Sequence, residues 1–122
     1  MSGSKGSFQT PPEVPFGPEL PHGWCYYYEK ASFSRQLGDW EQVARLGEEA
    51  LSLGFSAKDP IEWLPFLQAY ARFDDVVRLE EIAFFVTSDL SAAGQACQTL
   101  SAMPLNSSML EQVDRLFCVK NQ

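Results

Sequence analysis

The chain has 122 residues, of which 45% are hydrophobic and 13% aromatic, enough to fill the core of one domain. Sixteen acidic residues outnumber nine basic ones, so the formal net charge is −7, and no run of lysine or arginine concentrates positive charge. We therefore expect no binding to nucleic acid through neutralised phosphates.

The first 21 residues form a leader rich in Gly, Ser and Pro. Its prolines oppose both helix and central strand, so residues 1–21 are predicted to be an irregular linker or an arm that lies on the domain. Residues 1–7 are typical of an expression scar or a flexible leader, and they lack the apolar core of a signal peptide. No stretch approaches the roughly 20 apolar residues of a membrane span, so the chain as supplied is expected to be soluble.

Two helices are predicted after the leader. Residues 24–37 contain neither Pro nor Gly, and Leu37, Gly38 and Asp39 end this run with a turn. Asp39 is the expected N-cap of the second helix and Gly54 its end. The apolar or small residues of the second helix recur at helical spacing and are Trp40, Val43, Ala44, Gly47, Ala50 and Leu51.

A second pair of helices is predicted over residues 59–88. Asp59 is the expected cap, and Pro60 occupies the first turn, where its missing N–H costs nothing. Pro65 leaves two alternatives: the helix starts near Leu64, or its first turn is bent at Pro65. The apolar stripe of the next helix contains Val76, Leu79, Ile82, Ala83 and Val86.

A third pair is predicted over the remaining residues. The first stripe contains Leu90, Ala93, Cys97 and Leu100, and Pro104 ends that helix. Ser108 and Glu111 have the spacing of a capping box at the start of the last helix. The last stripe contains Met109, Leu110, Val113, Leu116 and Phe117. No segment has the period-2 alternation of a half-buried strand.

The helix starts recur about every 30 to 37 residues, a period typical of stacked helical hairpins. We predict an all-α domain over residues 22–122, with about six helices in three stacked antiparallel hairpins. The first pair resembles a tetratricopeptide repeat, with small contacts at Ala31 and Ala50 and a turn at Gly38–Trp40, although Gly47 replaces an aromatic residue. In the second pair only residues 72–75 resemble that turn.

A second resemblance covers residues 21–71. The matching residues are His22, Trp24–Tyr27, Glu29–Ala31, Arg35–Gln36, Gly38–Trp40, Glu62, Pro65–Phe66 and Tyr70–Ala71. This run resembles the soluble C-terminal region that follows the membrane-spanning part of bacterial, Chloroflexota-type glycosyltransferases similar to dolichyl-phosphate-mannose protein mannosyltransferases. The resemblance implies a soluble domain attached to a bacterial membrane protein. The sugar-transfer activity it implies belongs to the membrane part, so no catalytic residue carries over.

Metal and cofactor chemistry find little support in the sequence. Cys25, Cys97 and Cys118 are widely spaced and odd in number, which favours free and mostly buried thiols, although one disulfide stays open. His22 is the only histidine, so we predict no metal site, no cofactor and no catalytic residue. The adjacent acidic pairs, such as Glu48–Glu49 and Glu80–Glu81, are expected to be solvated faces and caps rather than acid–base pairs.

The aromatic residues near the start of the domain allow two interpretations. Trp24, Tyr26, Tyr27, Tyr28 and Phe33 point in successive directions around a helix, so they cannot all face one core. They pack against the leader and the neighbouring helix, or some of them anchor a peptide or sugar. If a groove exists, the first helices of the first two pairs should line it with Tyr28, Ser32, Arg35, Trp63, Leu67 and Tyr70.

These observations favour a non-catalytic accessory or protein-interaction domain, a fragment of a membrane glycosyltransferase-like protein, with a protein or peptide as partner. One alternative is a domain that binds a glycan or a lipid-linked sugar and assists a glycosyltransferase. Another is a free-standing tetratricopeptide adaptor that binds a peptide, which the scarcity of Lys and Arg to hold a terminal carboxylate disfavours.

Overall fold

The computed structural model describes residues 23–118, and this part of the chain contains six α-helices, one turn of 3₁₀-helix and no β-strand. The elements are α1 (Trp24–Gln36), α2 (Trp40–Ser52), η1 (Pro60–Trp63), α3 (Leu64–Arg72), α4 (Val76–Val86), α5 (Leu90–Ser101) and α6 (Ser107–Phe117). The predicted all-α class is therefore confirmed. The predicted leader, residues 1–21, lies outside the described residues.

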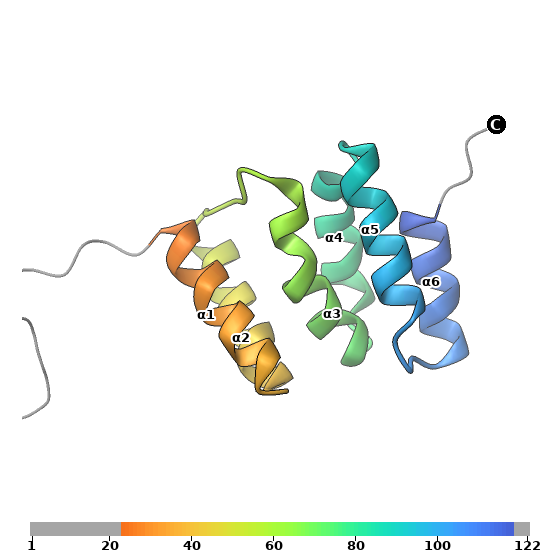
Figure 1. Ribbon diagram of the computed structural model, residues 1–122, viewed down its shortest axis with the longest axis horizontal. Helices are drawn as coiled ribbons and strands as arrows, with labels where there is room; N and C mark the ends of the chain where they lie inside the picture. The colour runs from red at the N-terminus through yellow and green to blue at the C-terminus, as the bar shows by residue number, and fades with distance from the viewer. Residues whose placement is uncertain (1–22, 119–122) are drawn as a thin grey trace, which may run out of the picture.

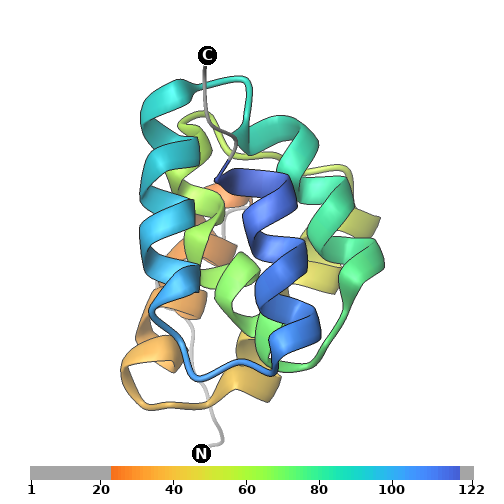
Figure 2. The ribbon, with the colours of Figure 1, turned by 90° about the vertical axis from the view of Figure 1, so that its right-hand side faces the viewer.

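The helices pair along the chain into three hairpins, which lie side by side along the long axis of the molecule (Figure 1). Helix α3 is central, because it contacts α1, α2, α4 and α5 as well as η1. Viewed from the C-terminal hairpin, α6 lies in front and packs on both α5 and α4 (Figure 2). This arrangement matches the predicted stack of helical hairpins.

The first two hairpins share one turn geometry. Gly38 has φ 76°, and Asp74, at the equivalent place before α4, has φ 58°. The next residues, Asp39 and Asp75, each donate a backbone N–H to the carbonyl five residues earlier, at 2.9 Å in both turns. Their carboxylates cap α2 and α4 by accepting from the N–H three residues on, at 3.2 and 3.1 Å. The repeat is therefore visible in the backbone even where the sequence has Asp instead of Gly.

The start of α6 differs from the prediction. The cap is Asn106, whose amide oxygen accepts from the N–H of Met109 at 2.7 Å, and the helix begins at Ser107. The predicted capping box of Ser108 and Glu111 is therefore wrong. The amide group of Asn106 also donates to the Asp74 carboxylate at 2.9 Å, so the cap ties the last hairpin to the turn before α4. The side-chain amide of Asn106 has both a donor and an acceptor, so it can cap α6 and bind Asp74 at the same time.

The two alternatives at Pro65 are resolved by η1. Asp59 accepts from the N–H of Ile61 at 3.2 Å, as expected of a cap, but Pro60 opens a short 3₁₀ turn that ends at Trp63. The α-helix starts at Leu64 and holds Pro65 in its first turn. A first-turn proline loses no hydrogen bond, so α3 needs no bend.

The predicted apolar stripes of the second, fourth and sixth helices face the core. Their buried members are Val43, Gly47 and Ala50 of α2, Leu79, Ile82, Ala83 and Val86 of α4, and Met109, Val113 and Phe117 of α6. The stripe predicted for α5 is only partly right. Leu100 is buried as predicted, but the other buried residues are Ala92 and Ala96, and Leu90 is 77% exposed. Alanines allow α5 to lie close to α3 and η1, and this packing decides which face turns inward.

Gly47 marks the closest approach of α2 and α3. A Cβ atom at this position would lie 2.4 Å from the Tyr70 hydroxyl and 2.9 Å from a ring carbon of Phe66. The missing side chain therefore makes room for the rings of α3. This explains why Gly47 departs from the aromatic residue expected of a tetratricopeptide repeat.

The expectation of free, mostly buried thiols is wrong. Cys97 in α5 and Cys118 at the end of α6 form a disulfide across 21 residues of sequence, with their Cα atoms 5.0 Å apart, and Cys25 is free but exposed. The antiparallel course of α5 and α6 brings the two cysteines together. The bond fastens the C-terminal end of α6 to α5.

The Gly47→Ala substitution should destabilise the domain by about 1–3 kcal/mol, because the new methyl group overlaps Tyr70. Urea denaturation followed by circular dichroism measures the change. Gly94→Ala is the matched control: nothing lies within 4 Å of its Cβ position, so helix propensity should make it neutral or stabilising. Combining Gly47→Ala with Tyr70→Phe should recover part of the loss, and a Gly47→Ala variant as stable as the parent would contradict the close contact.

Replacing both Cys97 and Cys118 by Ser should lower the free energy of unfolding by about 3 kcal/mol, because the unfolded chain regains the entropy of a loop of this length. A thiol reductant should lower the urea midpoint of the parent chain and leave that of the double variant unchanged. Cys25→Ser is the control and should behave like the parent. Equal reductant sensitivity in all three chains would count against the disulfide.

Candidate functional site

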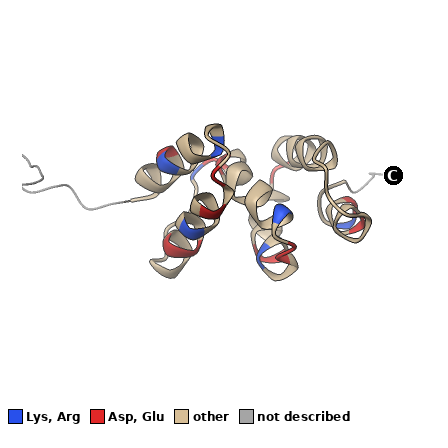
Figure 3. Cartoon of the chain, turned by 90° about the horizontal axis from the view of Figure 1, so that it is seen from below, with Lys and Arg blue, Asp and Glu red and all other residues tan. Residues whose placement is uncertain are grey.

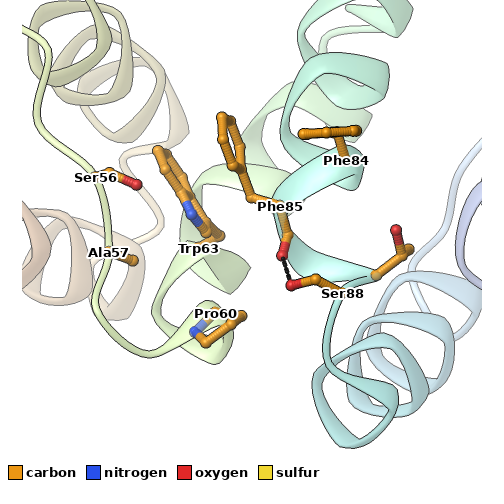
Figure 4. A pocket seen from close by; sticks show the side chains of 8 residues that line it. Ser56, Ala57, Pro60, Trp63, Phe84, Phe85 and Ser88 are labelled. Atoms are coloured by element: carbon orange, nitrogen blue, oxygen red, sulfur yellow. Dashed lines mark hydrogen bonds between the residues drawn. The ribbon is translucent and has the colours of Figure 1, made fainter.

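A hollow lined by aromatic rings lies between the C-terminal end of α4 and the segment that leads into η1 (Figure 4). Its volume is about 530 Å³. We call it the aromatic hollow, and its lining consists of Ser56, Ala57, Pro60, Trp63, Phe84, Phe85, Thr87 and Ser88. It is open to solvent, and the two phenylalanines form the wall on the α4 side (Figure 4).

The rings of the hollow are held by a stack that begins in the core. Trp63 is 1% exposed and lies between Trp24, at 4.6 Å between ring centroids, and Phe85, at 6.0 Å with an interplanar angle of 16°. Phe84 meets Phe85 edge to face at 5.7 Å. Trp63 is thus the buried support, while Phe85 and Phe84 are 40% and 77% exposed. The hollow presents rigid aromatic surface to water.

The exposure of Phe84 and Phe85 follows from the register of α4. Successive residues of a helix point about 100° apart, and the buried stripe of α4 uses Ile82, Ala83 and Val86. Both phenylalanines fall outside that stripe. Sequence reasoning missed them, although two adjacent phenylalanines beside a complete apolar stripe were the signal that could have identified them.

Two of the three hydroxyl groups that line the hollow are hydrogen-bonded to α4. Thr87 donates its hydroxyl to the carbonyl of Ala83 at 2.8 Å, and Ser88 donates to the carbonyl of Phe85 at 2.7 Å. No lining residue is ionisable. The hollow therefore offers apolar contact, with no acid–base pair among the residues that line it.

The six residues expected to line a groove do not come together on one open surface. Trp63, Leu67 and Tyr70 are 1%, 0% and 2% exposed, so they belong to the core, because α3 is covered by four other helices. Leu67 and Tyr70 do not line the hollow, whereas Trp63 is one of its lining residues although it is almost completely buried.

The other three predicted residues, Tyr28, Ser32 and Arg35, are half-buried on α1. Tyr28 stacks on Trp24 with ring centroids 6.4 Å apart, and Arg35 donates to the side-chain oxygen of Gln68 at 3.0 Å. Arg35 therefore bridges α1 and α3. Contact of these three residues with a partner stays a prediction.

The aromatic residues of α1 divide between packing and exposure. Trp24 packs on Phe66 at 5.4 Å and donates its ring N–H to Glu62 at 2.7 Å. Tyr27 is 2% exposed and lies against Phe55, whereas Phe33 is 62% exposed. Trp24, Tyr26 and Tyr27 therefore pack against the core of the domain. The predicted packing of these rings against the leader lies outside the described residues.

Basic and acidic residues lie near one another on the other helices, whereas α5 has no charged residue (Figure 3). Arg78 binds both carboxylate oxygens of Glu48 at 2.5 Å and also Glu81 at 2.6 Å, so it joins α2 to α4. Arg115 likewise joins α6 to Glu80 at 2.7 Å. Glu48, Glu80 and Glu81 lie on solvated faces as predicted, since their side chains are about half exposed, and they also form these ion pairs. Hydrogen bonds from Arg78 lower the pKa of Glu48, whereas burial raises the pKa of the neighbouring Tyr70 hydroxyl.

Two further searches of residues 23–118 gave negative results. No group of three or more His, Cys, Asp or Glu side chains in this range is placed to hold a metal ion. None of the helices described here combines the length and the apolar character that crossing a bilayer requires.

Comparison with models of protein families, with curated proteins and with solved structures yields no match for this chain. The resemblances to tetratricopeptide repeats and to the C-terminal region of membrane glycosyltransferases therefore stay predictions from the residues quoted above. The site has to be interpreted from its own geometry.

The ion pair of Glu48 and Arg78 predicts a specific pH dependence. Because the pKa of Glu48 is lowered in the folded state, its contribution is present above the ordinary Glu pKa and is lost as pH falls through the folded value. The side chains of Glu48 and Arg78 are 47% and 29% exposed, so solvent screens the ion pair. We therefore expect the ion pair to contribute about 0.5–1 kcal/mol to the free energy of unfolding. The difference in unfolding free energy between the parent and Glu48→Gln should be largest near pH 6 and shrink towards pH 3.

Urea denaturation across this pH range measures that difference, with Glu41→Gln, an exposed residue of the same helix, as control. A Glu48→Gln difference that stays constant with pH would show that the ion pair does not stabilise the fold.

Proposed function

We propose that this domain is a non-catalytic interaction module that binds an apolar segment of a protein partner in the aromatic hollow. The observation that carries the proposal is the pair Phe84 and Phe85, exposed at 77% and 40% beside a hollow of about 530 Å³. Phe85 stacks on the buried Trp63, and Phe84 meets Phe85 edge to face. Aromatic rings provide a large contact area at a small cost in side-chain entropy on binding.

The energetic reasoning supports an apolar partner. Removing a large apolar side chain from water is worth about 1.5–3 kcal/mol, and aromatic residues at the edge of a pocket are frequent binding hot spots. Phe84 and Phe85 stand next to each other on the wall of the hollow, so one inserted side chain can cover both.

A glycan fits the hollow less well than a peptide. Sugars need hydrogen-bonding groups around an exposed ring, but Thr87 and Ser88 donate their hydroxyl hydrogens to carbonyls of their own helix. Two of the rings on which the sugar alternative relied, Trp63 and Tyr70, are buried. The hollow also has no basic side chain to hold the terminal carboxylate of a peptide, so the proposed ligand is an internal apolar segment.

We also propose that the domain is accessory to a membrane glycosyltransferase-like protein, on the resemblance of residues 21–71 alone. The reading frame of the gene tests this: a series of hydrophobic spans upstream is the expected result. A frame without such spans would favour a free-standing adaptor.

A selection experiment tests the hollow directly. The full chain is used to select from a displayed library of random 12-residue peptides, and we expect enriched peptides to carry aromatic or aliphatic residues. Phe84→Ser should weaken their binding at least tenfold, or about 1.4 kcal/mol. Phe33→Ser is the matched control, because Phe33 is a similarly exposed phenylalanine on α1, outside the hollow.

Isothermal titration calorimetry with the selected peptides measures the affinities of the parent and both variants. Failure to enrich any peptide, or an equal loss for Phe33→Ser and Phe84→Ser, would contradict the proposed function.

A further inference from the structure

We propose that the chain's own Pro-rich leader, residues 8–21, is the resident occupant of the aromatic hollow and binds there in cis as a polyproline II helix. This inference rests on the proposed function, since it assumes that the hollow accepts a peptide. It adds the class of ligand, a proline-rich segment, and a form of regulation, because an external partner would have to displace the leader.

The leader has the period of a polyproline II helix. A proline occurs at every third position, at Pro12, Pro15, Pro18 and Pro21. Polyproline II has three residues per turn, so these four prolines would lie along one edge. Because prolines restrict the backbone before binding, a segment of this kind loses little conformational entropy when it docks.

The same period sorts the other side chains of the leader. Val14, Gly17 and Leu20 would share a second, apolar edge, while Glu13 and Glu19 would lie with Phe16 on the third. Two edges are thus apolar, and both carboxylates are confined to the remaining one. The hollow has no charged lining residue, so the acidic edge would face solvent.

The walls of the hollow suit this occupant. Grooves lined by aromatic rings recognise proline-rich segments, because the flat rings pack against the ridges of a polyproline II helix. Here Phe84 and Phe85 stand opposite Pro60 and the segment that carries Ser56 and Ala57 (Figure 4). The open side of the hollow leaves room for an extended chain to pass across it.

The leader enters the domain beside the hollow. Its last residues lead through Gly23 into Trp24, whose ring lies 4.6 Å from that of Trp63, and Trp63 in turn stacks on Phe85. Pro18 lies five residues before Gly23, and Phe16 lies seven residues before Gly23. These separations correspond to about 16 and 22 Å of polyproline II chain. The hollow is therefore within reach.

The tether also favours the leader over other ligands. A short covalent linker gives an effective concentration in the millimolar range, so even weak intrinsic affinity would keep the hollow occupied. A second copy of the chain or a free partner lacks this advantage at ordinary concentrations. The leader is thus the ligand that the hollow meets first.

A photocrosslinking experiment on the full chain tests the contact. Phe84 is replaced by p-benzoylphenylalanine, and the residues captured after irradiation are identified by mass spectrometry. We expect crosslinks to residues 8–21 within a single chain, with a yield that does not change on twentyfold dilution. Crosslinks between two chains, crosslinks confined to the folded domain, or none at all would overturn the proposal.

A competition experiment separates this proposal from the proposed function. The Pro15→Gly, Pro18→Gly double variant of the full chain should bind a library-selected peptide at least threefold more tightly than the parent. The reason is that the leader would leave the hollow empty in a larger fraction of the molecules. The matched control is Glu13→Gln, Glu19→Gln, which changes the edge expected to face solvent and should bind like the parent.

The outcomes are distinct. If the parent and the proline variant bind the selected peptide equally, the leader is not the occupant, while the hollow still binds peptides. If no peptide binds either chain but Phe84 crosslinks to the leader, the leader contact holds and recognition of an external partner fails.

Discussion

The packing of α3 on all sides is the constraint on which the rest of the structure depends. Its aromatic residues Trp63, at the junction with η1, Phe66 and Tyr70 are almost completely buried, and each needs a particular neighbour. Tyr70 and Phe66 fit against α2 only because Gly47 has no side chain. Trp63 fits because Trp24 and Phe85 lie on its two sides. The position of the first hairpin therefore depends on the rings that the middle hairpin has to bury.

The central position of α3 also decides where aromatic surface remains. In a stack of hairpins the first helix of each pair is a natural place for a binding groove, but here the rings of α3 are used in the core. The exposed rings lie instead at the end of α4, where Phe84 and Phe85 stand outside the buried stripe. Because Phe85 stacks on Trp63, the exposed ring packs directly on a ring of the core, and a ligand in the hollow would contact a ring held in place by the core.

The turns between helices show how a repeat persists while its residues change. Gly38 adopts a positive φ without strain, whereas Asp74 adopts one with a side chain present. The Asp74 carboxylate accepts from Asn106, the cap of α6, so a position that resembles a defect of the repeat also holds the third hairpin. The ion pair of Arg78 and Glu48 links α4 to α2, and the ion pair of Arg115 and Glu80 links α6 to α4. These contacts join one hairpin to the next across the stack.

The amino-acid sequence by itself determined the helical class, the positions of the helices, most caps and the inward faces of α2, α4 and α6, because periodicity and capping act within a few residues. Only the tertiary structure decided the inward face of α5, the pairing of Cys97 with Cys118, the burial of Leu67 and Tyr70, and the exposure of Phe84. Each of these depends on which segments, distant along the chain, come to lie side by side. Local spacing cannot report that, since the same apolar stripe is compatible with more than one neighbour until the hairpins are packed.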